Sequence, residues 1–295
     1  MPNELAVLDY SADWALKERN VERRDLPGYL SLEDVVELYG SLGVAALEYY
    51  DSYWYDYSVD QLSKLADDVG LAVSAYVFDA RLNQPDEPRC AEVERVNALL
   101  DRGAQLGAPL CMVHPAFYDE EQPFDAQLDW LIDGLKRCAA HAESLGTVLV
   151  AENIDYPPVA RFMGTSTECA EVAAAVDSPG FGLVYDCGAT VTMAEDALKA
   201  LERMAPYVAY VHLKNHVLLA DGEEAARVYP NLDCSRRCRG TDLADGEVDV
   251  PAVIAELARI GYGGYVVIEY QGEEDPRVAL PRNVEYVRSL LAAAA

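Results

Sequence analysis

The chain has 295 residues, 51% of them hydrophobic, and its 51 acidic residues outnumber its 23 basic residues to give a formal net charge of −28. This length and apolar fraction suffice for one large core, and a charge of this sign repels phosphate backbones and anionic membrane surfaces. We therefore expect a single domain over residues 1–295, with neither nucleic acid nor a membrane as a partner.

The cysteines and the first residues indicate the compartment. Seven cysteines are dispersed without CxxC spacing, which is typical of a reducing environment. Cys234 and Cys238 stand four residues apart, but two further ligands at matching spacing are missing, so ordinary thiols are preferred to a metal site. No apolar stretch reaches 18 residues, and a signal-peptide pattern is missing from the start. These features predict a cytoplasmic protein.

Short apolar runs recur along the chain, and amphipathic stretches separate most of them. The runs begin near Leu5, Val44, Leu71, Pro109, Thr147, Phe181, Val208 and Gly264. Alternation of strand and helix at this spacing predicts an α/β protein with a parallel sheet and right-handed crossovers. Eight such units predict a closed (β/α)8 TIM barrel.

The expected helices carry start and stop signals. Capping boxes begin at Ser31 and Ser58, and Thr167 opens a further helix with early acidic residues. Glycines are expected to end several helices just before the next strand, at Gly40 or Gly43, Gly70, Gly107, Gly146 and Gly261.

Two polar segments interrupt this alternation. One covers roughly residues 11–30 after the first strand, and the other is a long insertion at about 217–247 after the seventh strand. Both follow the carboxyl end of a strand, so both should overhang the mouth at which TIM barrels carry their active sites. We expect lids or substrate walls there, with unstructured decoration as the alternative.

Four residues of metal-ligand type stand at or just past the ends of expected strands, namely Glu152, Asp186, His212 and Glu269. The carboxyl ends of barrel strands surround one mouth, so side chains from strands five to eight can converge despite large sequence gaps. Three carboxylates and one imidazole suit Mn²⁺ or Mg²⁺, and Co²⁺ or Zn²⁺ is also compatible. Taken singly, each carboxylate has an alternative role as an ordinary strand-end residue that caps a helix or binds loop amides.

The motifs around these residues carry a family resemblance. They read Ala-Glu152-Asn, Tyr-Asp186-Cys-Gly, Val-His212-Leu-Lys214-Asn and Tyr-Val-Val-Ile-Glu269-Tyr. The chain thereby resembles the sugar phosphate isomerase/epimerase superfamily, the xylose-isomerase-like TIM barrels, over nearly its whole length. The resemblance implies a divalent ion, commonly Mn²⁺, at the four positions and enolisation of a keto sugar or polyol ketone. It also implies that Glu152 and Glu269 serve as acid/base groups.

One position departs from the family pattern. Epimerases of the family often carry Asp-x-Gly-His on the sixth strand, where the histidine contacts substrate oxygens, whereas this chain has Asp186-Cys-Gly-Ala189. The departure weakens the expectation of a standard ketose 3-epimerase reaction.

Two further residues are candidates for catalysis. His114 ends the fourth strand, beside the strand that carries Glu152, and is expected to act as a general base or acid. Its alternatives are to position a substrate hydroxyl or to bind a loop. Lys214 lies two residues past His212, and so on the same side of the strand. It is expected to bind a substrate oxygen or a developing anion, or else to pair with a ligand carboxylate.

Substrate contacts are expected from other parts of the mouth. Glu48 ends the second strand and Asp79 ends the third, so each either reaches the substrate or buttresses the rim. Trp54 belongs to an aromatic cluster after the second strand that either stacks on a sugar or is structural. Arg239 and two neighbouring arginines in the insertion are candidates to hold a phosphate or carboxylate, or to neutralise nearby acids.

The preferred function is a metal-dependent isomerase or epimerase that removes a proton α to the carbonyl of a keto sugar. The alternative is a lyase of the same superfamily, either a dehydratase or a C-/O-deglycosidase catalytic subunit that cleaves 3-keto-glycosides with a small accessory partner. A homo-oligomer is equally compatible with the resemblance. A DNA repair enzyme of the endonuclease IV type requires more histidines than the four present, and the charge opposes DNA. A non-catalytic carbohydrate-binding barrel is the remaining class.

Overall fold

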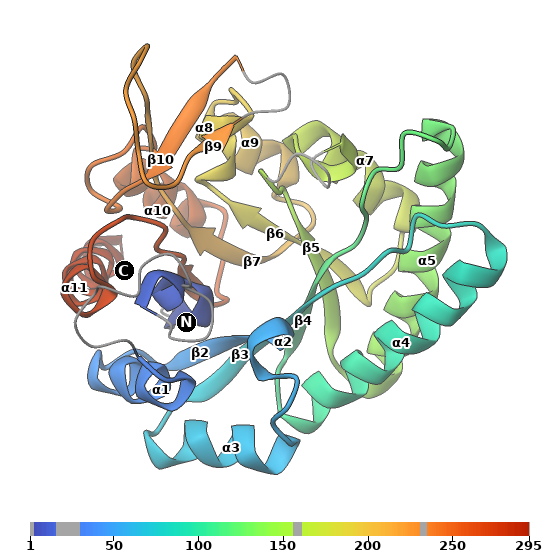
Figure 1. Cartoon of the computed structure of the whole chain (residues 1–295), viewed down its shortest axis with the longest axis horizontal. Coiled ribbons are helices and arrows are strands. Elements are labelled where there is room, and N and C mark those ends of the chain that lie inside the picture. Colours follow the sequence, from blue (N-terminus) through green and yellow to red (C-terminus); the bar gives the residue numbers. More distant parts are fainter. Residues whose placement is uncertain (1–2, 16–29, 156–160, 231–234, 295) are drawn as a thin grey trace.

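The computed structural model describes residues 3–15, 30–155, 161–230 and 235–294. Within them, eight parallel strands form a closed barrel (Figure 1). These are β1 (Leu5–Leu8), β2 (Ala46–Tyr50), β3 (Ala72–Asp79), β4 (Leu110–His114), β5 (Val148–Glu152), β6 (Phe181–Asp186), β7 (Val208–Leu213) and β11 (Val266–Ile268). Strand β11 pairs with both β7 and β1 and so closes the ring. The predicted (β/α)8 fold is confirmed, with all eight strands where they were expected.

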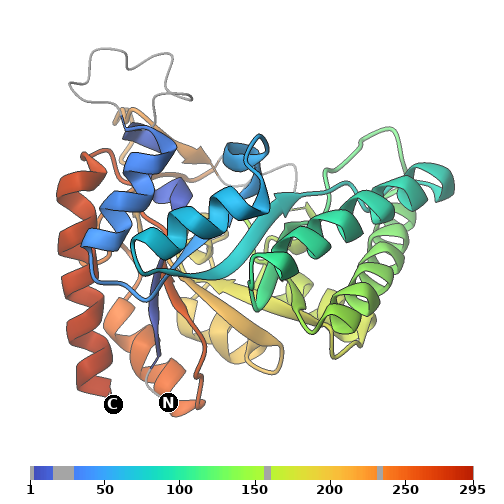
Figure 2. The same cartoon turned by 90° about the horizontal axis from the view of Figure 1, so that it is seen from below.

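Helices surround this barrel. The longer ones are α1 (Leu32–Ser41), α3 (Val59–Asp68), α4 (Asp86–Gln105), α5 (Phe124–Leu145), α7 (Ser166–Val176), α9 (Ala197–Met204), α10 (Val250–Arg259) and α11 (Pro276–Ala294). Short turns of helix follow three strands, as η1 (Asp9–Ala15), α2 (Asp51–Trp54) and α8 (Ala189–Thr192). Figure 2 shows α4 and α5 lying side by side and projecting beyond the barrel. No helix among the described residues combines the length and hydropathy of a membrane span.

The helix boundaries follow local signals in the sequence. Ser31 and Ser58 form the expected capping boxes. Helix α7 instead begins one residue before the expected Thr167, because the capping box is formed by Thr165 and Glu168. Gly146 caps α5 in the left-handed conformation (φ 75°), which a glycine adopts without a steric penalty.

The other predicted helix stops also have positive φ, at Gly43, Gly70, Gly107 and Gly261. Gly40 instead lies inside α1, where an added Cβ would come within 2.6 Å of the Cβ of Val69. The choice between Gly40 and Gly43 is therefore resolved in favour of Gly43.

The barrel is a packed core beneath its mouth. Alternate strand positions contribute an inner apolar cluster that includes Val77, Met112, Val150 and Tyr210, while the other positions join the outer core with the helices. The hydroxyl of Tyr210 is satisfied, since it donates to Ser74 Oγ at 2.8 Å. Both faces of each strand are buried, which explains why the strands appear in the sequence as continuous apolar runs.

The described part of the long insertion after β7 is folded. It carries a three-stranded antiparallel sheet of β8 (His216–Leu218), β10 (Arg237–Gly240) and β9 (Tyr229–Pro230), in that spatial order. Figure 1 shows this sheet in orange, standing beside the end of β7. The polar segment at 11–30 lies largely outside the described residues, which omit 16–29. The insertion, by contrast, contributes residues from Arg227 to Pro230 to the lining of the cavity at the mouth of the barrel.

Candidate metal centre

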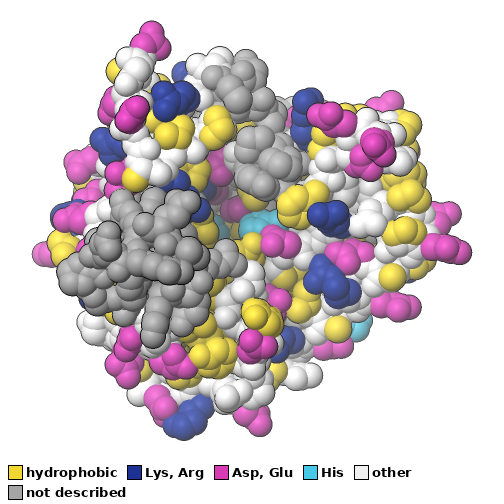
Figure 3. All heavy atoms as spheres, in the orientation of Figure 1, with side chains coloured by type: hydrophobic (Ala, Val, Ile, Leu, Met, Phe, Trp, Pro, Cys, Tyr) yellow, Lys and Arg dark blue, Asp and Glu magenta, His cyan; other side chains and the backbone are white. Residues whose placement is uncertain are grey.

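A cavity of about 730 Å³ lies at the carboxyl ends of the barrel strands. Its polar lining comes from residues at the ends of β2, β3, β4, β5, β7 and β11, and the inserted segment adds residues from Arg227 to Pro230. Figure 3 shows histidine atoms in cyan, with acidic side chains beside them, near the centre of this face. The cavity is therefore placed where TIM barrels build active sites.

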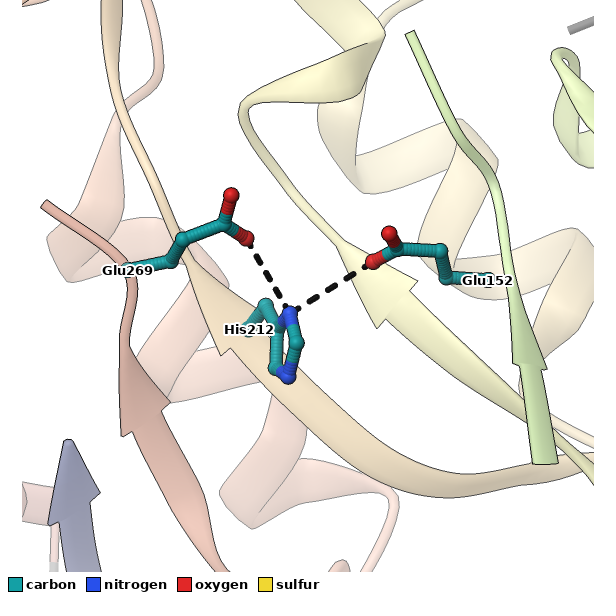
Figure 4. Close-up of side chains that lie close together, drawn as sticks. All are labelled: Glu152, His212 and Glu269. Carbon is teal, nitrogen blue, oxygen red and sulfur yellow. Dashed lines mark hydrogen bonds and ion pairs between the residues drawn. The ribbon is translucent and has the colours of Figure 1, made fainter. Parts of the chain in front are cut away.

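Three of the four predicted ligands converge in this cavity. Glu152 ends β5, His212 lies on β7 and Glu269 follows β11, and each offers a ligand atom within 4.8 Å of the other two. His212 Nδ1 lies 3.1 Å from Glu269 Oε2 and 3.4 Å from Glu152 Oε2 (Figure 4). All three side chains are buried. Two carboxylates and one imidazole are consistent with a divalent metal site.

An unsatisfied oxygen supports the fit of this group to a cation. Glu152 Oε2 is buried and accepts no hydrogen bond of ordinary geometry from the described residues, and its neighbour His212 Nδ1 lies 3.4 Å away. A buried carboxylate oxygen without a donor is unfavourable, and a divalent cation would remove that penalty. The residues present therefore fit a divalent metal.

Asp186, the expected fourth ligand, lies beside the three-residue group and faces Lys214. Its Oδ1 accepts the Gly188 N–H at 2.8 Å, whereas its Oδ2 lies 2.5 Å from Lys214 Nζ. Asn153 fixes the backbone of Asp186 by donating to its carbonyl and accepting from its N–H, both at 2.8 Å. One oxygen of Asp186 is thus committed to the backbone and the other to a cation.

Lys214 is buried among acidic groups. Besides Asp186, its Nζ lies 3.4 Å from Glu269 Oε1 and 3.5 Å from Asp155 Oδ2. Burial alone would lower the pKa of Lys214, but these carboxylates raise it well above its usual value. The structure therefore pairs Lys214 with Asp186 and Glu269 and also places it in the cavity lining, so its contact with a substrate oxygen stays a prediction.

His114 lies between two carboxylates. Its Nδ1 lies 2.8 Å from Asp79 Oδ1 and its Nε2 3.2 Å from Glu152 Oε1, and the Tyr50 hydroxyl donates to Asp79 Oδ2 at 2.8 Å. Burial alone would lower the pKa of His114, but the hydrogen bonds to Asp79 and Glu152 raise it to about 10. Burial would likewise raise the pKa of Glu152, yet hydrogen bonds from His114 and His212 hold it below its usual range. The pair is therefore held as imidazolium and carboxylate.

The predicted substrate residues occupy different places. Glu48 lines the cavity, and its Oε2 lies 3.1 Å from His212 Nε2. Trp54 is fully buried outside the lining, because the chain turns into α2 after β2 and the indole N–H donates to Asp9 at 2.6 Å. Arg239 is also absent from the lining, since it lies on β10, the central strand of the appended sheet. The structure thus places Trp54 and Arg239 outside the cavity lining, and their expected substrate contacts stay predictions.

Several cavity residues were not anticipated from the sequence. Gln271 donates from Nε2 to Glu269 Oε1 at 2.7 Å, and its position two residues past Glu269 is the signal that strand alternation offers. Asp155 stands three residues past the end of β5. Arg227 hydrogen-bonds Tyr10, and its guanidinium lies 5.1 Å from the Tyr10 ring and 5.5 Å from the Tyr229 ring. The contact between Arg227 and Tyr10 brings the insertion and the short helix η1 together at the mouth.

Comparison with known proteins places this geometry in context. The family model described as xylose isomerase-like TIM barrel matches residues 36–290. The chain is 26% identical over 282 residues to an inosose dehydratase from Geobacillus thermodenitrificans (strain NG80-2), which covers 89% of each protein. It is 31% identical over 160 residues to an inosose dehydratase from Geobacillus kaustophilus (strain HTA426), which covers 53% of this chain and 49% of that protein.

Two solved structures share the fold. An L-ribulose 3-epimerase has a TM-score of 0.75 at 17% identity, with coverage of 99% of this chain and 95% of the other. The probable 3-DHS dehydratase AsbF from Bacillus anthracis has a TM-score of 0.72 at 14% identity, with coverage of 97% and 98%. At these identities the likeness concerns the fold alone.

Proposed function

The chain belongs to the xylose isomerase-like TIM barrel family of sugar-active enzymes, and we propose that within it the protein is a metal-dependent lyase that removes water from a keto-inositol or keto sugar. The relative that matches 89% of the chain is an inosose dehydratase, which favours the lyase over the isomerase or epimerase that the motifs first suggested. The observation that carries the proposal is the contact of 3.2 Å between His114 and Glu152.

An elimination needs a base and an acid on the same cavity. Glu152 is the proposed base that takes the proton from the carbon next to the carbonyl. His114, kept protonated by Asp79 and Glu152, is the proposed acid that gives its Nε2 proton to the neighbouring hydroxyl, which leaves as water. The products are one water and an unsaturated ketone. Glu152 then returns its proton to His114 across their contact, which restores both groups for the next turnover.

The remaining residues would stabilise the negative charge that develops during the reaction. Glu152, His212 and Glu269, with Asp186 as the fourth ligand, would hold a divalent ion, which would supply electrostatic stabilisation for the negative charge that develops on the ketone oxygen. Gln271 orients Glu269 through its 2.7 Å hydrogen bond. Lys214 brings a positive charge to the same Oε1 atom of Glu269. Glu48 holds His212 in place through the contact with its Nε2 atom.

A second candidate function is the isomerase or epimerase first expected. It is favoured by the two carboxylates Glu152 and Glu269, which both approach His212 Nδ1 from different strands. Carboxylates on two sides of a bound sugar suit the exchange of a proton between its faces. The cytoplasmic location, the accessory subunit and the homo-oligomer remain predictions.

The test incubates the protein, reconstituted with Mn²⁺, with a panel of keto-inositols and keto sugars in D₂O. Loss of one water by mass spectrometry, with new vinyl signals by NMR, is the expected result. The variant His114→Asn should keep the metal but lose dehydration, whereas the control His141→Asn changes a histidine that pairs with Asp101 outside the cavity. Deuterium in an intact sugar with an altered stereocentre would instead identify the isomerase or epimerase. An absence of both exchange and dehydration would refute both functions.

A further inference from the structure

The buried ammonium of Lys214 shares carboxylates with the proposed metal ligands. Its side chain is 3% exposed, and its Nζ contacts Asp186 at 2.5 Å and Glu269 at 3.4 Å. A buried ammonium and buried carboxylates are each unfavourable alone, and each is retained because the other compensates its charge. Lys214 therefore performs, for two of the four predicted ligands, the charge compensation that a metal would also perform.

The ammonium and a metal require the same oxygen of Asp186. Oδ1 of Asp186 is occupied by the N–H of Gly188 at 2.8 Å, so Oδ2 is the atom that remains for a cation. That Oδ2 is the atom that faces Lys214. Asp186 is also the predicted ligand that stands outside the group of Glu152, His212 and Glu269. Asp186 Oδ2 is thus the candidate partner of two cations, the Lys214 ammonium and a divalent metal ion.

The stem of Lys214 is fixed, whereas its end has a second partner. A Cβ added at Gly188 would lie 2.6 Å from Lys214 Cγ, so a side chain at position 188 would collide with the stem, and the Cys187 thiol donates to the Lys214 carbonyl at 3.2 Å. Asp155 Oδ2 lies 3.5 Å from Nζ, and it accepts no hydrogen bond from the described residues. A small movement of Nζ away from Asp186 therefore leads to another carboxylate.

We propose that Lys214 is the internal counter-ion of the metal centre and competes with the metal for Asp186. In the metal-free protein the ammonium holds Asp186 and keeps the acidic pocket folded. When the metal binds, Asp186 is released to the metal, and Asp155 retains the ammonium at the cavity wall. Lys214 thus lowers metal affinity and stabilises the empty site. The inference rests on the proposed metal site and deepens it, because it assigns control of metal loading to one residue.

The first test measures Mn²⁺ affinity by titration of EDTA-treated protein, with free Mn²⁺ followed by electron paramagnetic resonance. Lys214→Met should bind Mn²⁺ about tenfold more tightly than the wild type, because a competing charge has been removed. Its metal-free form should melt at a lower temperature. Lys64→Met is the matched control, because Lys64 also pairs with an aspartate, Asp68 at 2.6 Å, but is 71% exposed. The control should change neither quantity.

A second neutral variant, Lys214→Gln, covers the case in which methionine prevents folding, since it keeps a polar end without the charge. Mn²⁺ binding by both neutral variants that is equal to or weaker than that of the wild type would overturn the inference while leaving the metal site intact. The absence of Mn²⁺ binding by the wild type and both variants would overturn the metal site itself. The two failures are therefore distinguishable without any measurement of activity.

A double-mutant cycle tests the role of Asp155. Asp155→Asn should weaken Mn²⁺ binding in the wild type, because Lys214 then lacks a partner to which it can move. The same substitution should have a smaller effect in the Lys214→Met background, where no ammonium needs to be retained. Equal effects in both backgrounds would show that Asp155 acts on the metal directly and would refute the movement of Lys214.

Discussion

The hydrogen bonds between Asn153 and the backbone of Asp186 yield a sharp prediction. Both residues are fully buried, and Asn153 forms two bonds of 2.8 Å to the N–H and the carbonyl of Asp186. The variant Asn153→Ala removes both partners at once. Each buried backbone group left without a partner costs about 1–3 kcal/mol, so the free energy of unfolding should fall by about 2–6 kcal/mol. This is a large share of the roughly 5–15 kcal/mol that stabilises a typical domain.

Urea unfolding followed by circular dichroism measures this loss, and an unchanged m-value would confirm that the denatured state is not affected. Asn97→Ala is the matched control, because Asn97 Oδ1 accepts no hydrogen bond from the described residues. The control should change stability by less than about 1 kcal/mol. The folded fraction of Asn153→Ala should also bind Mn²⁺ more weakly, since Asp186 is no longer held in place. A loss of less than about 1 kcal/mol for Asn153→Ala would refute the argument from buried polar groups.

Three further predictions concern the metal, the acid and the pH dependence of stability. Glu152→Gln and His212→Ala should lose both bound Mn²⁺ and activity, as measured by metal analysis and turnover; activity in a metal-free sample of either variant would exclude metal-assisted enolisation. Asp79→Asn should lower kcat by about 10²-fold or more with little change in KM, because His114 loses the carboxylate at Nδ1; an unchanged kcat would remove His114 from the mechanism. Burial raises the pKa of Asp9 to about 8, so the folded protein holds a proton that the unfolded chain releases near pH 3.8. This contribution to stability is complete below that pH and disappears as pH rises through about 8. Asp9→Asn should therefore gain stability relative to the wild type between about pH 5 and pH 9 in urea titrations, and a constant difference would contradict the raised pKa.

The barrel and the three converging ligands were predictable because parallel strands follow simple rules. Each strand is buried on both faces, so its apolar run is visible in the sequence, and all eight strands end at one mouth. A polar residue at such an end must therefore approach its counterparts from neighbouring strands. Glu152, His212 and Glu269 follow this rule and meet within 4.8 Å.

Other features depended on contacts that no local pattern reveals. Strand β10 has the sequence Arg-Cys-Arg-Gly, and β9 has only two residues. Neither strand therefore shows an apolar alternation from which the appended sheet could be predicted. Trp54 follows a strand end as a substrate-binding aromatic would, yet the short helix α2 turns its indole toward Asp9. Alternation placed Lys214 on the side of His212, but the choice of Asp186 as its partner depends on the spatial arrangement of β6 and β7.

The position of the appended sheet has a consequence for how such an enzyme changes over time. The described part of the insertion at about 217–247 adds Arg227 and Tyr229 to the cavity without supplying a strand to the barrel. The carboxylates and the imidazole that carry the chemistry come from the barrel itself. Mutation or exchange of this segment can therefore alter which molecule fits while the reactive groups keep their geometry. Selectivity and reactivity are encoded in separate stretches of the gene, and evolution or protein engineering can act on one without disturbing the other.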